Sequence, residues 1–152
     1  MIGLLQRVDG ASVEVDGREI ARIGPGLLVL VGVERGDDEA IADRLLERLA
    51  NYRVFADPEG RMNLSVSDVG GGLLLVPQFT LAADTSQGLR PGFSRASPPG
   101  DAERLFGYMA KRAEKRLSGA QTGRFGAHMR VALVNDGPVT FWIRVPPHDA
   151  PE

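Results

Sequence analysis

The feature that most constrains the fold is an unbroken aliphatic run over residues 27–33, which directly follows a glycine–proline–glycine break. A run of this kind is typical of a strand that is buried on both faces. Residues 73–76 repeat the pattern after three consecutive glycines. Two such strands need packing partners on both sides, so the sequence predicts a layered structure built around a central sheet.

Two amphipathic helices are predicted to supply one of those layers. The first follows Asp37 or Asp38, either of which can cap a helix, and its apolar residues Ile41, Leu45 and Leu49 recur at helical spacing. The second is predicted over residues 101–117. Lysines and arginines in its last two turns complement the negative end of the helix dipole, so they need no ligand to explain them.

The remaining periodic segments indicate strands. The alternation predicts strands over residues 2–8, 11–15, 19–23, 52–55, 129–134 and 139–145, with turns that include 16–17 and 135–138. We therefore expect an α/β fold: a single domain of layered, barrel-like β-sheets with two main helices packed on one side. The expected domain covers residues 1–145, followed by a disordered tail over residues 146–152.

Residue types that are missing narrow the chemistry. The 152 residues include no cysteine and only two histidines, His128 and His148. These counts exclude a disulfide framework, a thiol nucleophile and any cysteine-ligated zinc site, and a multi-histidine metal site needs more ligands than one chain holds. We expect no metal and no cofactor. The serines and threonines also lack a well-placed histidine base, so the substrate or a bound water is expected to supply much of any hydrolytic chemistry.

Charge is unevenly distributed along the chain. Residues 1–69 hold 13 acids and 8 bases (net -5), residues 70–134 hold 4 acids and 9 bases (net +5), and residues 135–152 hold 3 acids and 1 base (net -2). The basic middle segment allows an anion-binding face within a chain of overall charge -2. The sequence shows no targeting signal and no apolar run long enough to span a bilayer, so we expect a cytoplasmic location.

Two short segments stand out as candidate sites. Residues 77–81 end the second buried strand, and strand ends in α/β proteins commonly meet ligands, although an ordinary strand-to-loop exit is the simpler explanation of this segment alone. Taken alone, residues 135–140 predict a hairpin turn. Pro138 fits such a turn poorly, because it has no N–H to donate to a strand ladder.

Taken together and in order, several segments resemble one family. These are Pro77 to Thr85, Gly88 to Pro91, Gln121 to Phe125 and Asn135 to Trp142, joined by Gln6-Arg7-Val8, Tyr52 to Phe55 and Met62 to Leu64. The chain resembles the D-aminoacyl-tRNA deacylases over residues 1 to about 145. The resemblance implies a homodimeric enzyme that hydrolyses the ester between a D-amino acid and the 3′-terminal adenosine of tRNA, and that also acts on glycyl-tRNA.

The resemblance also implies roles for residues. It gives Thr80 and Gln78 as candidate catalytic residues and Pro77, Phe79, Leu81 and Met129 as substrate-binding residues. It implies that Gly137-Pro138 forms a cis peptide which enters the partner subunit's pocket and rejects L-aminoacyl groups. Thr80 as a nucleophile and the terminal 2′-hydroxyl of the tRNA as the reactive group remain alternatives.

One residue departs from the family pattern, since Pro77 stands where the family usually has serine. This departure keeps open a non-catalytic binder of RNA ends or of a protein partner, beside an esterase for small D-amino-acid esters. For the acceptor-end phosphates of tRNA, the candidate RNA-binding residues in the basic segment are Arg90, Arg95, Lys111, Arg112, Lys115 and Arg116.

Overall fold

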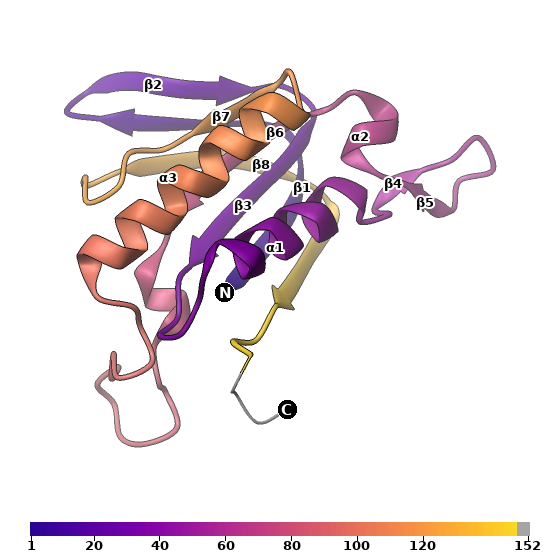
Figure 1. Ribbon diagram of the computed structural model, residues 1–152. Helices are drawn as coiled ribbons and strands as arrows, with labels where there is room; N and C mark the ends of the chain where they lie inside the picture. The colour runs from indigo at the N-terminus through magenta and orange to yellow at the C-terminus, as the bar shows by residue number, and fades with distance from the viewer. Residues whose placement is uncertain (149–152) are drawn as a thin grey trace.

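The computed structural model describes residues 1–148 and contains one curved sheet, a small two-stranded sheet and helices on one side (Figure 1). The elements are β1 Ile2–Val15, β2 Arg18–Ile23, β3 Gly26–Gly32, α1 Glu39–Asn51, β4 Phe55–Ala56, β5 Met62–Leu64, α2 Val66–Val69, β6 Gly72–Pro77, the 3₁₀ turn η1 Phe79–Ala82, α3 Pro99–Arg116, β7 Ala120–Thr122 and β8 Arg130–Arg144.

The main sheet is mixed and nearly closes into a barrel. Its strand order is β2-β1-β3-β6-β7, and β8 pairs with β1 outside this path. The β3–β6 and β6–β7 pairs are parallel, whereas β1 pairs antiparallel with β2, β3 and β8. The ends of the path approach each other, because the Arg22 backbone N–H on β2 donates to the Gln121 side chain on β7 at 2.9 Å.

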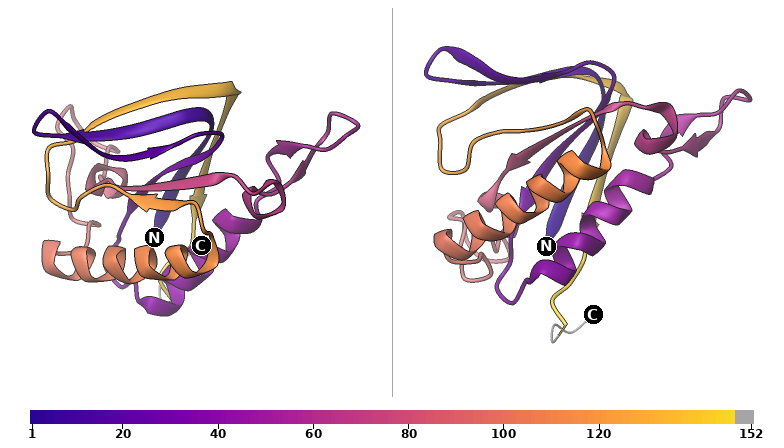
Figure 2. Two further views of the ribbon diagram at one scale, coloured as in Figure 1. Left: turned by 90° about the horizontal axis from the view of Figure 1, so that it is seen from above. Right: turned by 45° about the horizontal axis from the view of Figure 1, so that its top comes forward.

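Strands β3 and β6 form a wall between two hydrophobic cores. Leu27, Val29 and Leu75 face a core shared with α1 and α3, which lie together on one side of the sheet (Figure 2). Leu28 and Leu74, the alternate residues, face a second core inside the curved sheet. The predicted burial of both faces is confirmed, and so are the layered α/β class, the barrel-like sheet and the two main helices on one side.

Helix α1 begins where the sequence predicts. Asp38 is its N-cap, and the Asp38 carboxylate accepts a hydrogen bond from the Ile41 N–H at 2.9 Å. Helix α3 begins at Pro99, two residues before the predicted start, because proline is well suited to the first turn, where no N–H is needed. The short helix α2 was not predicted, although Ser65 and Asp68 form a capping box at its start.

The predicted hairpin turn at residues 135–138 is wrong. Strand β8 runs through this segment, and both of its halves pair with β1: Thr140 lies opposite Gln6 and Asn135 opposite Val8. Residues 136–139 therefore bulge out opposite the single residue Arg7. The predicted break between strands 2–8 and 11–15 is wrong for the same reason, because β1 is one long strand that spans both halves of β8.

Two smaller expectations also need correction. The strand predicted over residues 52–55 is confined to Phe55–Ala56, because Tyr52 caps the end of α1 and the Val54 N–H donates to the Tyr52 carbonyl in a tight turn. Of the expected tail, residues 149–152 lie outside the described residues. Among residues 1–148, no helix is both long and apolar enough to cross a membrane.

Candidate functional site

A cavity of about 670 Å³ opens where β6 ends, beside the start of α3 and the segment that leads into β8. Its wall is mostly apolar and combines residues from several elements and loops. The residues that line it are Arg35, Val76, Pro77, Gln78, Phe79, Phe93, Ala96, Ser97, Pro98, Pro99, Ala102, Phe125, Gly126, Ala127, His128, Met129 and Val131. Four of the predicted site residues, Pro77, Gln78, Phe79 and Met129, are thus brought together.

The turn after β6 is fixed by its contact with β3. The Gln78 N–H donates to the Val31 carbonyl at 2.8 Å, which extends the parallel ladder by one bond before η1 begins. Gly32 allows η1 to lie this close, because a Cβ on Gly32 would stand only 2.9 Å from the Leu81 Cβ. The end of β3 therefore positions the segment that carries the predicted site residues.

Pro77 is accommodated because nothing needs its missing N–H. Gln78 donates toward β3, so residue 77 faces the other side, where the last β6–β7 pair joins Leu75 to Thr122. The Pro77 Cδ points there toward Gly123, 3.5 Å from the position that a Cβ on Gly123 would occupy. The ladder bond nearest to this point runs from the Gly123 N–H to the Leu75 carbonyl at 2.8 Å and needs no donor from residue 77, so the proline interrupts none of the ladder bonds among the described residues.

Thr80 and Leu81 lie on η1 but do not line the cavity of their own chain. The Thr80 hydroxyl accepts a short hydrogen bond from the Gln78 amide. Within residues 1–148, no histidine or carboxylate hydrogen-bonds to this hydroxyl. Among the described residues, Thr80 therefore has no hydrogen-bonded general base that would turn it into a nucleophile.

Two aromatic rings stand at the mouth of the cavity. Phe79 and Phe93 lie with their ring centroids 5.1 Å apart and their planes tilted by 48°. They are 59% and 40% exposed, far more than rings in a core. Phe93 was missed by the sequence reasoning, since it lies in an irregular loop and no pattern around it indicates proximity to residue 79.

Gly137 and Pro138 lie at the exposed bulge of β8 and do not line the cavity of the same chain. The peptide between them is cis, as the resemblance implies. The Asn135 side chain bridges the bulge: its Oδ1 accepts from the Val139 N–H at 2.7 Å, and its Nδ2 donates to the Thr140 hydroxyl at 2.9 Å. The bulge is thus held by hydrogen bonds that replace the missing ladder.

Arg7 holds the same bulge from β1. Its Nε donates to the Asp136 carbonyl at 3.1 Å, and its Nη1 donates to the Val54 carbonyl at 2.6 Å. The side chain is only 15% exposed. The sequence reasoning gave Arg7 no role, although a charged residue within an apolar strand was a usable signal.

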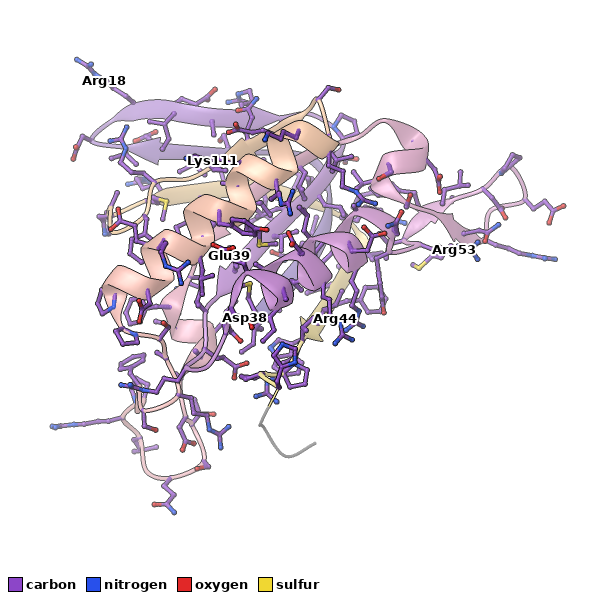
Figure 3. The ribbon with its side chains drawn as sticks, in the orientation of Figure 1. Arg18, Asp38, Glu39, Arg44, Arg53 and Lys111 are labelled. Atoms are coloured by element: carbon purple, nitrogen blue, oxygen red, sulfur yellow. The ribbon has the colours of Figure 1, made fainter. Side chains whose placement is uncertain are left out.

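The six predicted RNA-binding residues lie outside the cavity wall: Arg90, Arg95, Lys111, Arg112, Lys115 and Arg116. On α3, Arg112 pairs with Asp43 at 3.2 Å, and Arg116 pairs with Glu47. The Tyr108 hydroxyl and the Asp43 carboxylate raise the pKa of Arg112 through hydrogen bonds to its guanidinium. An RNA-binding role for the six stays a prediction. Figure 3 shows Lys111 on the exposed side of α3.

Two basic side chains that the RNA-binding prediction did not include line the cavity, Arg35 and His128. Both are exposed. Within residues 1–148, no group of three or more histidine, cysteine, aspartate or glutamate residues is arranged to hold a metal ion. Charge at this cavity is therefore positive or neutral, because its wall includes no carboxylate.

Comparison with known proteins gives consistent results. The family model for D-Tyr-tRNA(Tyr) deacylase matches residues 4–144. A D-aminoacyl-tRNA deacylase of Nitrosococcus oceani is 60% identical over 97% of this chain and 95% of its own length. One from Pseudomonas fluorescens is 61% identical over 95% of this chain and 99% of its own length.

A solved structure gives the same result in three dimensions. The c-Myc DNA Unwinding Element Binding Protein superposes with a TM-score of 0.92 at 36% identity, over 96% of this chain and 99% of that one. A probable eukaryotic D-amino acid tRNA deacylase, 17% identical, shares the fold with a TM-score of 0.77. The family match, the relatives and the fold agree over nearly the whole chain, and the chain belongs to the D-Tyr-tRNA(Tyr) deacylase family.

Proposed function

We propose that this protein hydrolyses the ester bond between a D-amino acid and the 3′-terminal adenosine of tRNA. Membership of the family makes the chain a D-aminoacyl-tRNA deacylase, an ester hydrolase. We assign this reaction to the cavity at the end of β6, because Pro77, Gln78 and Phe79 line it. Residues 1–145 form the functional unit, and a tRNA substrate places the enzyme in the cytoplasm.

The reaction needs little side-chain chemistry. Water adds to the ester carbonyl, the bond from the carbonyl carbon to the ribose oxygen breaks, and the products are a D-amino acid and tRNA with a free 3′-hydroxyl. Thr80 has no base beside it, so we assign activation of the water to the neighbouring 2′-hydroxyl of the tRNA. Gln78 and Thr80, which are hydrogen-bonded to each other, then position the ester.

Selection against L-aminoacyl groups is assigned to Gly137-Pro138 of a partner subunit. This segment is exposed, stands clear of its own cavity and is held in place by Arg7 and Asn135. Backbone groups at such a tip can bind the amino group of the substrate and leave no room for a side chain of the opposite hand. A glycyl group has no side chain to reject, so glycyl-tRNA is also a substrate.

A homodimer follows from this arrangement and from the outer face of β8. Strand β8 exposes large apolar side chains that a monomer in water would be expected to cover, and Val134 and Trp142 are the most exposed of them. Trp142 is 57% exposed and Val134 is 60% exposed. A second copy packed on β8 would bury this surface and bring the bulge toward the partner's cavity.

The experiment compares D-tyrosyl-tRNA, L-tyrosyl-tRNA and glycyl-tRNA as substrates of the intact protein. We expect release of D-tyrosine and glycine and no release of L-tyrosine. Equal release of both tyrosine enantiomers would refute selection by chirality. Tight, salt-sensitive binding of D-tyrosyl-tRNA without turnover would instead indicate a non-catalytic RNA binder, and efficient cleavage of D-tyrosine ethyl ester would indicate a small-ester hydrolase.

A further inference from the structure

We propose that Arg35 binds the phosphate that joins the terminal adenosine of the substrate to the preceding nucleotide. By this contact the enzyme distinguishes an aminoacylated nucleic acid from a small D-amino-acid ester. The inference rests on the proposed function and adds to it a residue that recognises the RNA from the cavity wall, which none of the six predicted basic residues lines.

The position of Arg35 is the first argument. It is exposed and follows the isolated bridge between Glu34 and Ala96, where the loop that carries Phe93 returns to the end of β3. Its backbone N–H donates to the Arg95 carbonyl at 2.9 Å. Arg35 is one of the residues that line the cavity, so it belongs to the wall of the site and not to a remote face.

The hydrogen bonding of the guanidinium is the second argument. Its Nε donates to the Ser94 carbonyl at 2.8 Å, which anchors the side chain against the loop. Within residues 1–148, no acceptor is bound to its Nη atoms and no carboxylate lies within 4.0 Å. The group is therefore held in place while its outer N–H groups remain available. A fixed guanidinium with free N–H groups suits two phosphate oxygens at once.

Three other arginines of the fold are already engaged. Arg7 is bound to two backbone carbonyls, Arg112 pairs with Asp43, and Arg144 pairs with Glu34 at 2.9 Å. Among the residues that line the cavity, Arg35 is the one arginine and none is a lysine. None of these residues is an aspartate or a glutamate. An anion that reaches this wall meets a positive charge that no described carboxylate neutralises.

The chemistry of the substrate supplies the matching anion. A tyrosyl or glycyl group and the adenosine carry no negative charge, so the first phosphate on the 5′ side is the nearest anion to the ester. A phosphate contact positions the strand without reading its sequence. This property suits an enzyme that must accept many tRNAs, and it leaves selection among substrates to the aminoacyl pocket.

The test uses two D-tyrosyl 3′-esters, one of adenosine and one of adenosine 5′-phosphate, together with D-tyrosyl-tRNA. We compare the wild type with Arg35→Gln, which removes the charge but keeps a donor for the Ser94 carbonyl, and with Arg35→Lys, which keeps the charge. Arg44→Gln is the control, because Arg44 is exposed on α1, away from the cavity wall (Figure 3).

For Arg35→Gln we expect kcat/KM to fall about tenfold for tRNA and for the phosphorylated ester, and to stay unchanged for the adenosine ester. Arg35→Lys should recover part of the loss, and Arg44→Gln should match the wild type on all three substrates. The wild type should prefer the phosphorylated ester, and increasing salt should erase that preference.

Two results would overturn the assignment. A wild type that cleaves both small esters equally well has no phosphate contact there, and a loss in Arg35→Gln of equal size on all three substrates would mean that Arg35 only supports the loop. Failure of the proposed function looks different, because the wild type would then cleave none of the three D-esters.

Discussion

At the scale of single residues, the site depends on side chains that hold backbone and not on side chains that exchange protons. Arg7 and Asn135 fix the bulge of β8, and Gln78 fixes the Thr80 hydroxyl. Each of these contacts joins a polar side chain to a segment that lacks regular ladder bonds. The proposed reaction therefore depends mainly on how precisely the protein positions the ester.

Thr80→Ala tests whether the protein supplies the nucleophile. We expect kcat for D-tyrosyl-tRNA to fall by less than about tenfold, because no base activates the hydroxyl, whereas loss of a true nucleophile costs on the order of 10⁶-fold. Single-turnover deacylation measures the difference, with Thr85→Ala as the control on an exposed neighbour. A loss of several orders of magnitude in a folded Thr80→Ala would restore Thr80 as the nucleophile.

Arg7→Met tests the support of the bulge. The change keeps a long side chain but removes the hydrogen bonds to Asp136 and Val54, each worth roughly 1.5–3 kcal/mol for a charged donor. We expect kcat/KM for D-tyrosyl-tRNA to fall at least tenfold. Arg22→Met, an exposed strand arginine paired with Glu19, is the control and should stay near wild type. Equal activity of the two variants would show that Arg7 does not position the bulge.

Three of the residues that line the cavity could be identified from the sequence alone: Pro77, Gln78 and Phe79. They follow one another at the end of a predicted strand. The sequence alone could not identify Arg35 or Phe93. These residues reach the cavity only through the return of an irregular loop to the end of β3, and no periodicity encodes that return.

At the scale of elements, the contact between β3 and η1 sets the geometry of the site. The sequence predicted β3 and β6 as buried strands, since both contain a run of consecutive aliphatic residues. It misjudged β8, because Asn135 to Pro138 has the composition of a turn. What decides between a hairpin and a bulge is which strand the two halves pair with, and both pair with β1. Composition holds no information on that choice.

Gly32→Ala tests this contact. The new Cβ would stand 2.9 Å from the Leu81 Cβ and 3.2 Å from the Gln78 carbonyl oxygen, so η1 must shift. We expect a loss of roughly 1–3 kcal/mol in the free energy of unfolding and a larger fractional loss of deacylation. Gly24→Ala is the matched control, because its Cβ would meet nothing within 4 Å. Denaturant titration and initial rates measure both; full activity in Gly32→Ala would contradict the role of this contact.

At the scale of the whole molecule, a barrel-like sheet covered by helices on one side leaves β8 as an apolar outer surface. The fold class, the two main helices and the family were all predictable from the sequence, because they follow from periodicity and from ordered motifs. The exposure of Val134 and Trp142 was not, since the apolar runs 131–134 and 141–143 resemble those of any strand in a sheet. The structure reveals it, because within residues 1–148 these two side chains are more than half exposed.

Trp142→Glu tests the proposed dimer. A carboxylate on the apolar face of β8 would be buried without a partner at the interface, so we expect the protein to become monomeric at micromolar concentration. We also expect deacylation to fall, because the partner's Gly137-Pro138 would be absent. Sedimentation velocity measures the mass, with Lys111→Glu on the exposed side of α3 as the control for added charge. A Trp142→Glu variant that stays dimeric would place the interface elsewhere.

The bulge of β8 has a consequence for how such an enzyme can be modified. Residues 136–139 lie opposite one residue of β1, and both flanking halves of β8 pair with β1, with a second register shift between Val8 and Gly10. A shorter or longer excursion at this place leaves the register of the flanking halves unchanged, provided that the Asn135 bridge and the Arg7 anchor remain. The segment proposed to reject L-aminoacyl groups is thus an insert between two paired halves of β8. Loop grafting can therefore change it without rebuilding the sheet.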